Sequence, residues 1–97
     1  DTGDTPEFRR LRGPRPFQLA IMPIGAYNPW RRRHCTPEEA WRMGNEAGAE
    51  RLLPVHHQTF ILSREPIMEP IQRLQQAAGR EAYRIAAHRP GDEVRIL

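Results

Sequence analysis

The stretch 36–48, TPEEAWRMGNEAG, decides the fold because it predicts a helix between two apolar runs of strand length. Thr36 and Glu39 have the spacing of a capping box, and Pro37 suits the first helical turn. Gly48 is a natural terminator, so we expect the helix over residues 37–47. Trp41 and Met43 are expected at the borders of its buried face. That face carries small residues, which allow close packing on a sheet: Ala40, Gly44 and Ala47.

The two apolar runs beside this helix are predicted to be strands. Phe17–Pro23, FQLAIMP, is suited to burial on both faces, and residues 24–30 should form a loop after it. The second run, residues 51–55 (RLLPV), contains Pro54, which indicates a sheet edge or an early strand end. Strand, helix and strand in this order predict an α/β fold, in which ligand sites gather beyond the carboxyl ends of the strands.

The outer segments carry weaker patterns. Thr5-Pro6-Glu7 is a helix-start pattern and predicts a short helix over residues 6–12. After a loop over residues 58–69, Pro70 should open a helix that Gly79 closes. Its expected buried stripe is Ile71, Leu74 and Ala78. Residues 83–87 and 93–97 are predicted to be strands on either side of a turn at residues 90–92.

Composition limits the classes of protein to consider. The chain of 97 residues has 15 basic residues, all Arg, and 12 acidic ones, and its only dense basic run is 31–33, so no nucleic-acid partner is expected. The single Cys35 excludes an internal disulfide and fits a reduced, cytoplasmic setting. No apolar run approaches the roughly 20 residues of a membrane-spanning helix, although a peripheral membrane contact is compatible with the sequence.

Two short constellations carry candidate metal ligands. Asp1-Thr2-Gly3 opens the chain, and residues 54–60, PVHHQTF, follow the second predicted strand. Carboxylate and imidazole groups at strand ends are ligands that zinc accepts, but a pair of residues does not make a site.

The stretch between these constellations resembles the N-acyl phosphatidylethanolamine phospholipase D type of metallo-β-lactamase-fold hydrolase. The resemblance rests on LAIMPIGAYNPW followed by HCTPEEAWRM, and it runs from Asp1 to about Leu74. In that family the Asp of a Gly-Asp-Thr-Gly turn bridges two zinc ions, and the His of a His-x-x-Thr-Phe segment is a zinc ligand. The matching positions are Asp1, residues 23–27, residues 37–40, His56, Thr59 and Phe60.

The resemblance implies that residues 1–97 are the C-terminal part of a hydrolase domain with the αβ/βα sandwich fold. The N-terminal half, with the family's His-x-His-x-Asp-His cluster and a further His ligand, would precede Asp1. Asp1 would then bridge two zinc ions in the complete site, and His56 would bind one of them. His57 stands where the phospholipase has an aromatic residue. Because neighbours on an extended segment face opposite ways, only one of the two histidines should ligate, and we favour His56.

Other candidate site residues each have an alternative explanation. His34 aligns with a site-lining histidine of the phospholipase, so it would orient substrate or move a proton, unless it is simply a solvated residue. Asp1 and His34 are thus the predicted catalytic residues. Tyr27 and Trp30 could bind an acyl chain together with Phe60, although aromatic residues are often packing residues. Outside these predictions, no nucleophilic Cys35–His34 pair is expected, because no third residue orients it. The arginines at 31–33 could hold a phosphate, but a solvated face is favoured. His88 is expected to be a surface residue.

The predicted function is that of a metal-dependent hydrolase, with a phosphodiester, such as a phospholipid, as substrate. A lactone or amide hydrolase with the same metals and a noncatalytic binding or assembly module are the alternatives. The 97 residues alone are expected to be inactive and not to hold two zinc ions tightly, because two named ligands are too few. The N-terminal half or another copy of the chain is the expected partner, since the strands read as buried on both sides.

Overall fold

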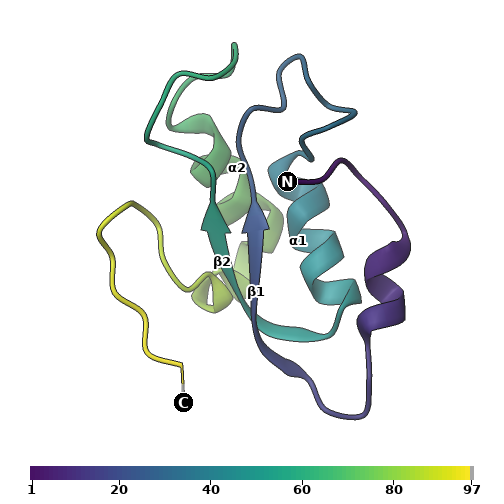
Figure 1. Ribbon diagram of the computed structural model, residues 1–97. Coiled ribbons are helices and arrows are strands. Elements are labelled where there is room, and N and C mark those ends of the chain that lie inside the picture. The colour runs from purple at the N-terminus through teal and green to yellow at the C-terminus, as the bar shows by residue number, and fades with distance from the viewer. Residues whose placement is uncertain (97) are drawn as a thin grey trace.

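A two-stranded parallel sheet lies at the centre of the chain, which the computed structural model describes from residue 1 to residue 96 (Figure 1). Strand β1 is Phe17–Pro23, as expected, and strand β2 is Ala49–Val55. β2 begins two residues earlier than expected and includes Pro54, which pairs in register with Met22 of β1. The two strands point the same way, so their carboxyl ends meet at one edge.

Helix α1, Pro37–Glu46, makes the crossover between the strands and has the predicted capping box. The Thr36 side chain accepts from the Glu39 amide, and the Glu39 carboxylate accepts from the Thr36 amide. The helix ends one residue earlier than expected, and Gly48 follows it with a positive φ of 83°. Gly44 allows the close approach to the sheet, since an added Cβ would lie 3.0 Å from Cδ1 of Leu52.

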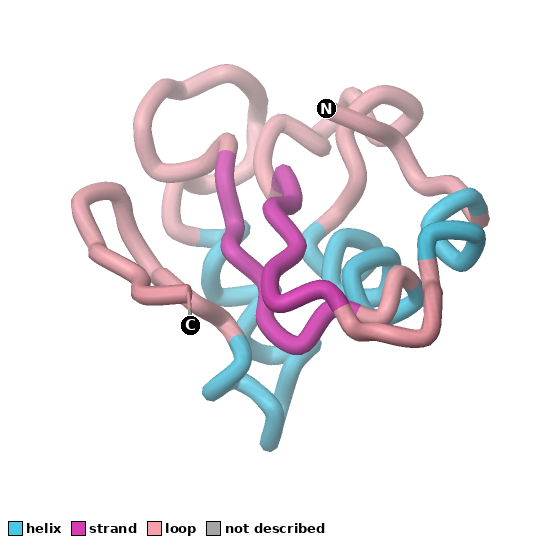
Figure 2. Tube along the Cα trace, turned by 60° about the horizontal axis from the view of Figure 1, so that its bottom comes forward, coloured by secondary structure: helices cyan, strands magenta, loops and turns pink. Residues whose placement is uncertain are grey.

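Helix α2, Glu69–Ala78, lies beside α1 on the same face of the sheet (Figure 2). Its predicted buried stripe is confirmed, and Gly79 caps it. Met43 corrects the expected border of α1: it is fully buried, because α2 covers that side of the helix. The core lies between the sheet and the two helices and contains Met22, Ile24, Cys35, Ala40, Met43, Leu52, Ile71, Leu74, Ala78 and Ile85.

The other face of the sheet is open in the described part of the chain. Phe17 and Ile21 of β1 keep 47% and 61% of their surface exposed, and Val55 of β2 keeps 37%. Within residues 1–96, β1 is thus buried on one face only, and burial of its other face stays a prediction that requires a partner. Both helices lie behind the other face, where α1 contacts both strands and α2 packs against α1 (Figure 1).

The two ends of the chain depart most from expectation. A 3₁₀ helix, Glu7–Leu11, replaces the helix predicted over residues 6–12, and it has no side-chain cap and no buried residue. A second 3₁₀ helix, Gly79–Arg84, overlaps the strand predicted over 83–87, of which only Ile85 pairs, through one bridge to Leu52. Residues 93–96 form no strand, and Leu97 lies outside the described residues.

Candidate metal centre

Three side chains with metal-ligating atoms meet beyond the carboxyl ends of β1 and β2. They are Asp1 from the start of the chain, His34 from the loop after β1, and His56 directly after β2. One ligand atom of each lies within 4.8 Å of the others. In the described residues this is the one group of three or more His, Cys, Asp or Glu side chains that could hold a metal ion.

The two imidazoles of this cluster are stacked and lack hydrogen-bond partners. Their ring centroids lie 5.4 Å apart with an interplanar angle of 8°, and Nδ1 of His56 lies 4.0 Å from Oδ1 of Asp1. Nδ1 of each histidine is buried and has no partner among the described residues. Burial lowers the pKa of His34, and the neighbouring His56 lowers it further. A neutral imidazole is the form that binds a metal.

Asp1 is held against the turn that carries His34. The Cys35 amide donates to the Thr2 carbonyl at 2.8 Å, and an added Cβ on Gly3 would lie 2.2 Å from the carbonyl oxygen of Arg32. Only glycine permits this approach, so Gly3 brings the Asp1 segment onto the turn.

His56 depends on an equally close approach at Gly25. The Ile24 amide extends the pairing of the strands by donating to the Val55 carbonyl at 3.0 Å. An added Cβ on Gly25 would lie 2.0 Å from the carbonyl oxygen of His56. His56 has a left-handed backbone, with φ of 63°, which is uncommon outside glycine. The close contact with Gly25 therefore determines the backbone conformation of His56, which a histidine does not favour by itself.

Glu65 ties together the two loops that carry the histidines, and the sequence offered no signal for it. Its carboxylate accepts from the Ala26 amide at 3.1 Å, from the Asn28 amide at 2.9 Å and from the Ser63 hydroxyl. The Arg64 amide also donates to the Asn28 carbonyl at 2.8 Å. These bonds hold the loop after β1 against the loop after β2.

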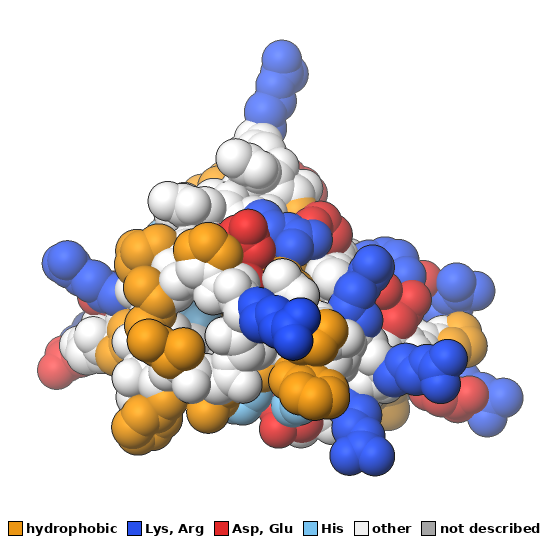
Figure 3. Space-filling view, turned by 90° about the horizontal axis from the view of Figure 1, so that it is seen from above, with side chains coloured by type: hydrophobic (Ala, Val, Ile, Leu, Met, Phe, Trp, Pro, Cys, Tyr) orange, Lys and Arg blue, Asp and Glu red, His pale blue; other side chains and the backbone are white. Residues whose placement is uncertain are grey.

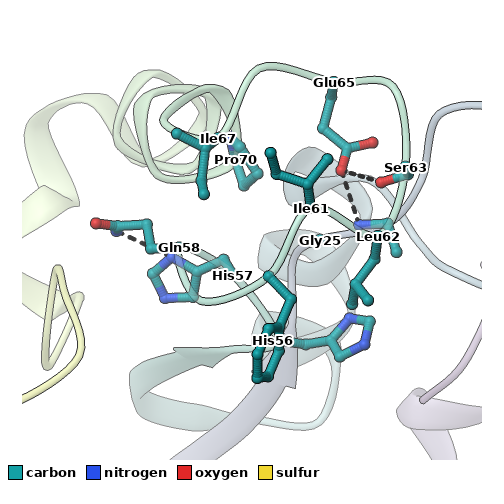
Figure 4. Close-up of a pocket in the computed structure, with 12 residues that line it drawn as sticks. Gly25, His56, His57, Gln58, Ile61, Leu62, Ser63, Glu65, Ile67 and Pro70 are labelled. Atoms are coloured by element: carbon teal, nitrogen blue, oxygen red, sulfur yellow. Dashed lines mark hydrogen bonds between the residues drawn. The ribbon is translucent and has the colours of Figure 1, made fainter.

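His57 lies on the other side of its segment from the cluster. In Figure 4 the rings of His56 and His57 point in opposite directions from the small pocket between them. Nδ1 of His57 lies 3.0 Å from the Gln58 amide nitrogen, and burial lowers the pKa of His57. The pocket, of about 30 Å³, has room for a water-sized group.

The predicted substrate-binding aromatics lie in different environments. Tyr27 is buried, donates its hydroxyl to Glu69 and lies under the guanidinium of Arg73, 4.7 Å from the ring centroid. Burial and the Glu69 carboxylate both raise the pKa of Tyr27. These contacts are packing contacts between the loop and α2. Trp30 is 57% exposed and lies on the turn of His34, whose amide donates to the Trp30 carbonyl.

Cys35 faces the core and not His34. Its thiol donates to the Pro23 carbonyl at 3.3 Å, and burial, followed by the nearby Glu39, raises its pKa to about 11. His88 is exposed and its ring contacts the Gln75 amide at 2.9 Å. Neither residue contributes to the cluster.

Comparison with known proteins relates the chain to two groups. It is 41% identical over 99 residues, 97% of its length, to uncharacterized proteins of Mycobacterium tuberculosis and Mycobacterium bovis. It is 38% identical over 64 residues, 63% of its length, to the mitochondrial N-acyl-phosphatidylethanolamine-hydrolyzing phospholipase D of Saccharomyces cerevisiae. The chain spans 27% of the mycobacterial proteins and 14% of the yeast enzyme. No family model matches it.

None of the helices within residues 1–96 is long and apolar enough to cross a membrane.

Proposed function

We propose that this chain is part of a metal-dependent hydrolase that cleaves a phosphodiester of a phospholipid. The observation that carries the proposal is the meeting of Asp1, His34 and His56 within 4.8 Å at the carboxyl edge of the sheet. The partial likeness to the yeast phospholipase D supports the reaction class. Because the chain spans about a quarter of its mycobacterial relatives, the activity proposed is that of the whole protein.

The residues of the cluster fit zinc. Zinc binds imidazole nitrogen and carboxylate oxygen, and the buried Nδ1 atoms of His34 and His56 lack any other partner in the described chain. Asp1 would bridge two ions, and His56 would bind one of them. The remaining ligands of a dinuclear site would come from outside residues 1–96. Bound zinc supplies a Lewis acid for the phosphoryl group and lowers the pKa of water.

His34 would orient the substrate or move a proton beside the metals. Its lowered pKa keeps the ring neutral near pH 7, so one ring nitrogen remains available to accept a proton or a hydrogen bond. The exposed ring of Trp30 on the same turn offers an apolar surface to an acyl chain. Tyr27 would act only by supporting the loop, since its hydroxyl is bound to Glu69.

The open face of the sheet would be covered by the other half of an αβ/βα sandwich. Phe17, Ile21 and Val55 form an apolar strip on that face, and such strips favour association. The 97 residues alone should therefore self-associate, and the variant Ile21→Lys should reduce this. A strictly monomeric chain in sedimentation, with Ile21→Lys unchanged, would contradict the half-sandwich proposal.

The metal site is tested by three variants of the full protein, with bound zinc and hydrolysis measured together. Asp1→Ala should lose both ions and all activity, because a bridging carboxylate holds the pair. His56→Ala should lose about one ion, whereas His57→Ala should keep both and retain most activity, since its ring points away from the cluster. His88→Ala is the matched control, being an exposed histidine outside the cluster.

Two results would overturn this assignment. If His57→Ala lost zinc while His56→Ala kept it, the ligand would be the neighbouring histidine. Zinc retained by all variants would remove the metal site altogether. Activity on a lactone or amide but not on a phosphodiester would replace the proposed substrate class while leaving the metal site intact.

A further inference from the structure

The end of the molecule that carries the cluster has an exposed apolar tip. On the loop after β2, Phe60 is 74% exposed, Ile61 87% and Leu62 54%. Trp30, on the loop after β1, is 57% exposed. Figure 3 looks onto this end and shows hydrophobic side chains gathered along one side, with arginine side chains next to them. A group of large apolar side chains that are each more than half exposed is uncommon on monomeric proteins and marks an interaction surface.

The apolar tip is a fixed part of the fold. Arg64 donates its amide to Asn28, and Glu65 accepts from the Ala26 and Asn28 amides, so the two loops are bonded just beside it. The stacked rings of His34 and His56 join the same two loops on the other side. Trp30 is thereby held on the same end of the molecule as residues 60–62.

Arginines beside the tip are free to meet an anion. Arg31, Arg32, Arg33 and Arg64 are exposed, and none forms an ion pair with another residue in 1–96. In contrast, Arg42, Arg73 and Arg84 pair with carboxylates at 3.7 Å or less. A projecting apolar group with unpaired cations beside it matches the interface of an anionic bilayer, where apolar side chains enter the acyl boundary and arginines reach the headgroups.

We propose that Phe60, Ile61, Leu62 and Trp30, with the arginines at 31–33, form a surface that binds anionic lipid bilayers. The charge of the neighbouring residues argues for an anionic bilayer, because Arg31, Arg32 and Arg33 are exposed beside Trp30 and form no ion pair within residues 1–96. The surface goes beyond the proposed reaction, since it requires neither metal nor hydrolysis. It would place the Asp1–His34–His56 cluster at the lipid surface.

The test is sedimentation of the full chain with vesicles of phosphatidylcholine containing phosphatidylglycerol, with a chelator present so that no metal contributes. Phe60→Ser/Ile61→Ser/Leu62→Ser should bind at least about ten-fold more weakly. Arg31→Gln/Arg32→Gln/Arg33→Gln should lose most of the preference for phosphatidylglycerol. The matched controls are Arg15→Gln/Arg80→Gln/Arg95→Gln, which removes three exposed charges elsewhere, and Phe17→Ser/Ile21→Ser on the open face. Both controls should bind within about two-fold of the parent.

Fluorescence adds a readout that a folding defect would not imitate. The chain has two tryptophans, so in a Trp41→Phe background the emission of Trp30 should shift to the blue when vesicles are added. Circular dichroism confirms that each variant is folded. Equal vesicle binding by the tip variants and the parent would overturn the proposal. If the tip variants instead lost self-association and kept vesicle binding, the tip would be a protein interface, which would also overturn it. Neither result bears on the zinc measurements above.

Discussion

The helix-covered face of the sheet and the loops at its carboxyl edge are held by different forces. Between the sheet and the helices, Ile24, Met43 and Leu74 have no exposed surface, and the contacts are apolar. At the loops, the Glu65 carboxylate and two close glycine contacts hold backbones together, and three non-glycine residues have left-handed φ: Ala26, His56 and Gln58. Stability therefore resides mainly in the first region, while the second stores strain to place the cluster.

The largest effect should come from truncating the core. Leu74→Ala removes a fully buried side chain and should lower the free energy of unfolding by about 2 to 5 kcal/mol. Ile61→Ala, at 87% exposure, is the control and should change it by less than about 0.5 kcal/mol. Urea unfolding measures both. Similar losses for the two variants would contradict the division between core and loops.

Gly25→Ala should damage the cluster more than the fold. Its Cβ would lie 2.0 Å from the His56 carbonyl oxygen, so the His56 backbone must move, and zinc affinity should fall about 10- to 100-fold. Gly13→Ala is the matched control, because nothing lies within 4 Å of the added Cβ, and it should leave zinc affinity unchanged. Competition with a chelating dye measures the affinity. Equal affinity in both variants would mean that the close approach does not position His56.

Glu65→Gln should cost about 1 kcal/mol at pH 7, because the carboxylate is partly exposed and its hydrogen bonds are screened. Partial burial raises the pKa of Glu65, but the bonds from the Ser63 hydroxyl and from the Asn28 and Ala26 amides outweigh it, so the pKa lies below its usual range.

A depressed folded pKa means that this stabilisation is present above the unfolded pKa of about 4.3 and is lost as the pH falls through the folded pKa. The difference in unfolding free energy between the parent and Glu65→Gln should therefore shrink as the pH is lowered from 7 to below 4. Glu93→Gln, which changes an exposed carboxylate, should show no such trend. A pH-independent gap for Glu65→Gln would rule out the role of the ionised carboxylate.

The smallest effect on unfolding free energy is expected at the border between the two regions, where chemical reactivity is measured instead of stability. Cys35 is buried, and its pKa is raised to about 11, so a disulfide reagent at pH 8 should modify it about 100-fold more slowly than in urea. In Gly25→Ala the modification rate of Cys35 should stay as low as in the parent if only the loops move. Rapid modification of the folded parent would show that the core opens where the loop after β1 begins.

The sequence by itself determined the elements whose signals are local. The capping box joins Thr36 to Glu39, three positions further on, and short-range sequence patterns set the apolar runs of β1 and β2 and the stripe of α2. Local sequence patterns gave a wrong prediction where an element forms only by pairing with a distant strand. Residues 83–87 have the composition of a strand, but a strand requires an edge to pair with along its length, and only Ile85 reaches Leu52.

Tertiary structure alone decided how the loops meet. Glu65 bonds to amides 37 and 39 residues away, and the contacts of Gly3 and Gly25 are with carbonyls of distant turns. The resemblance to phospholipase D named Asp1, His34 and His56 singly, but their distances depend on these contacts. The physical reason is that the long-range partners of a side chain are fixed only after the strands have paired and both helices have packed on one face. A local sequence pattern carries no information about those contacts.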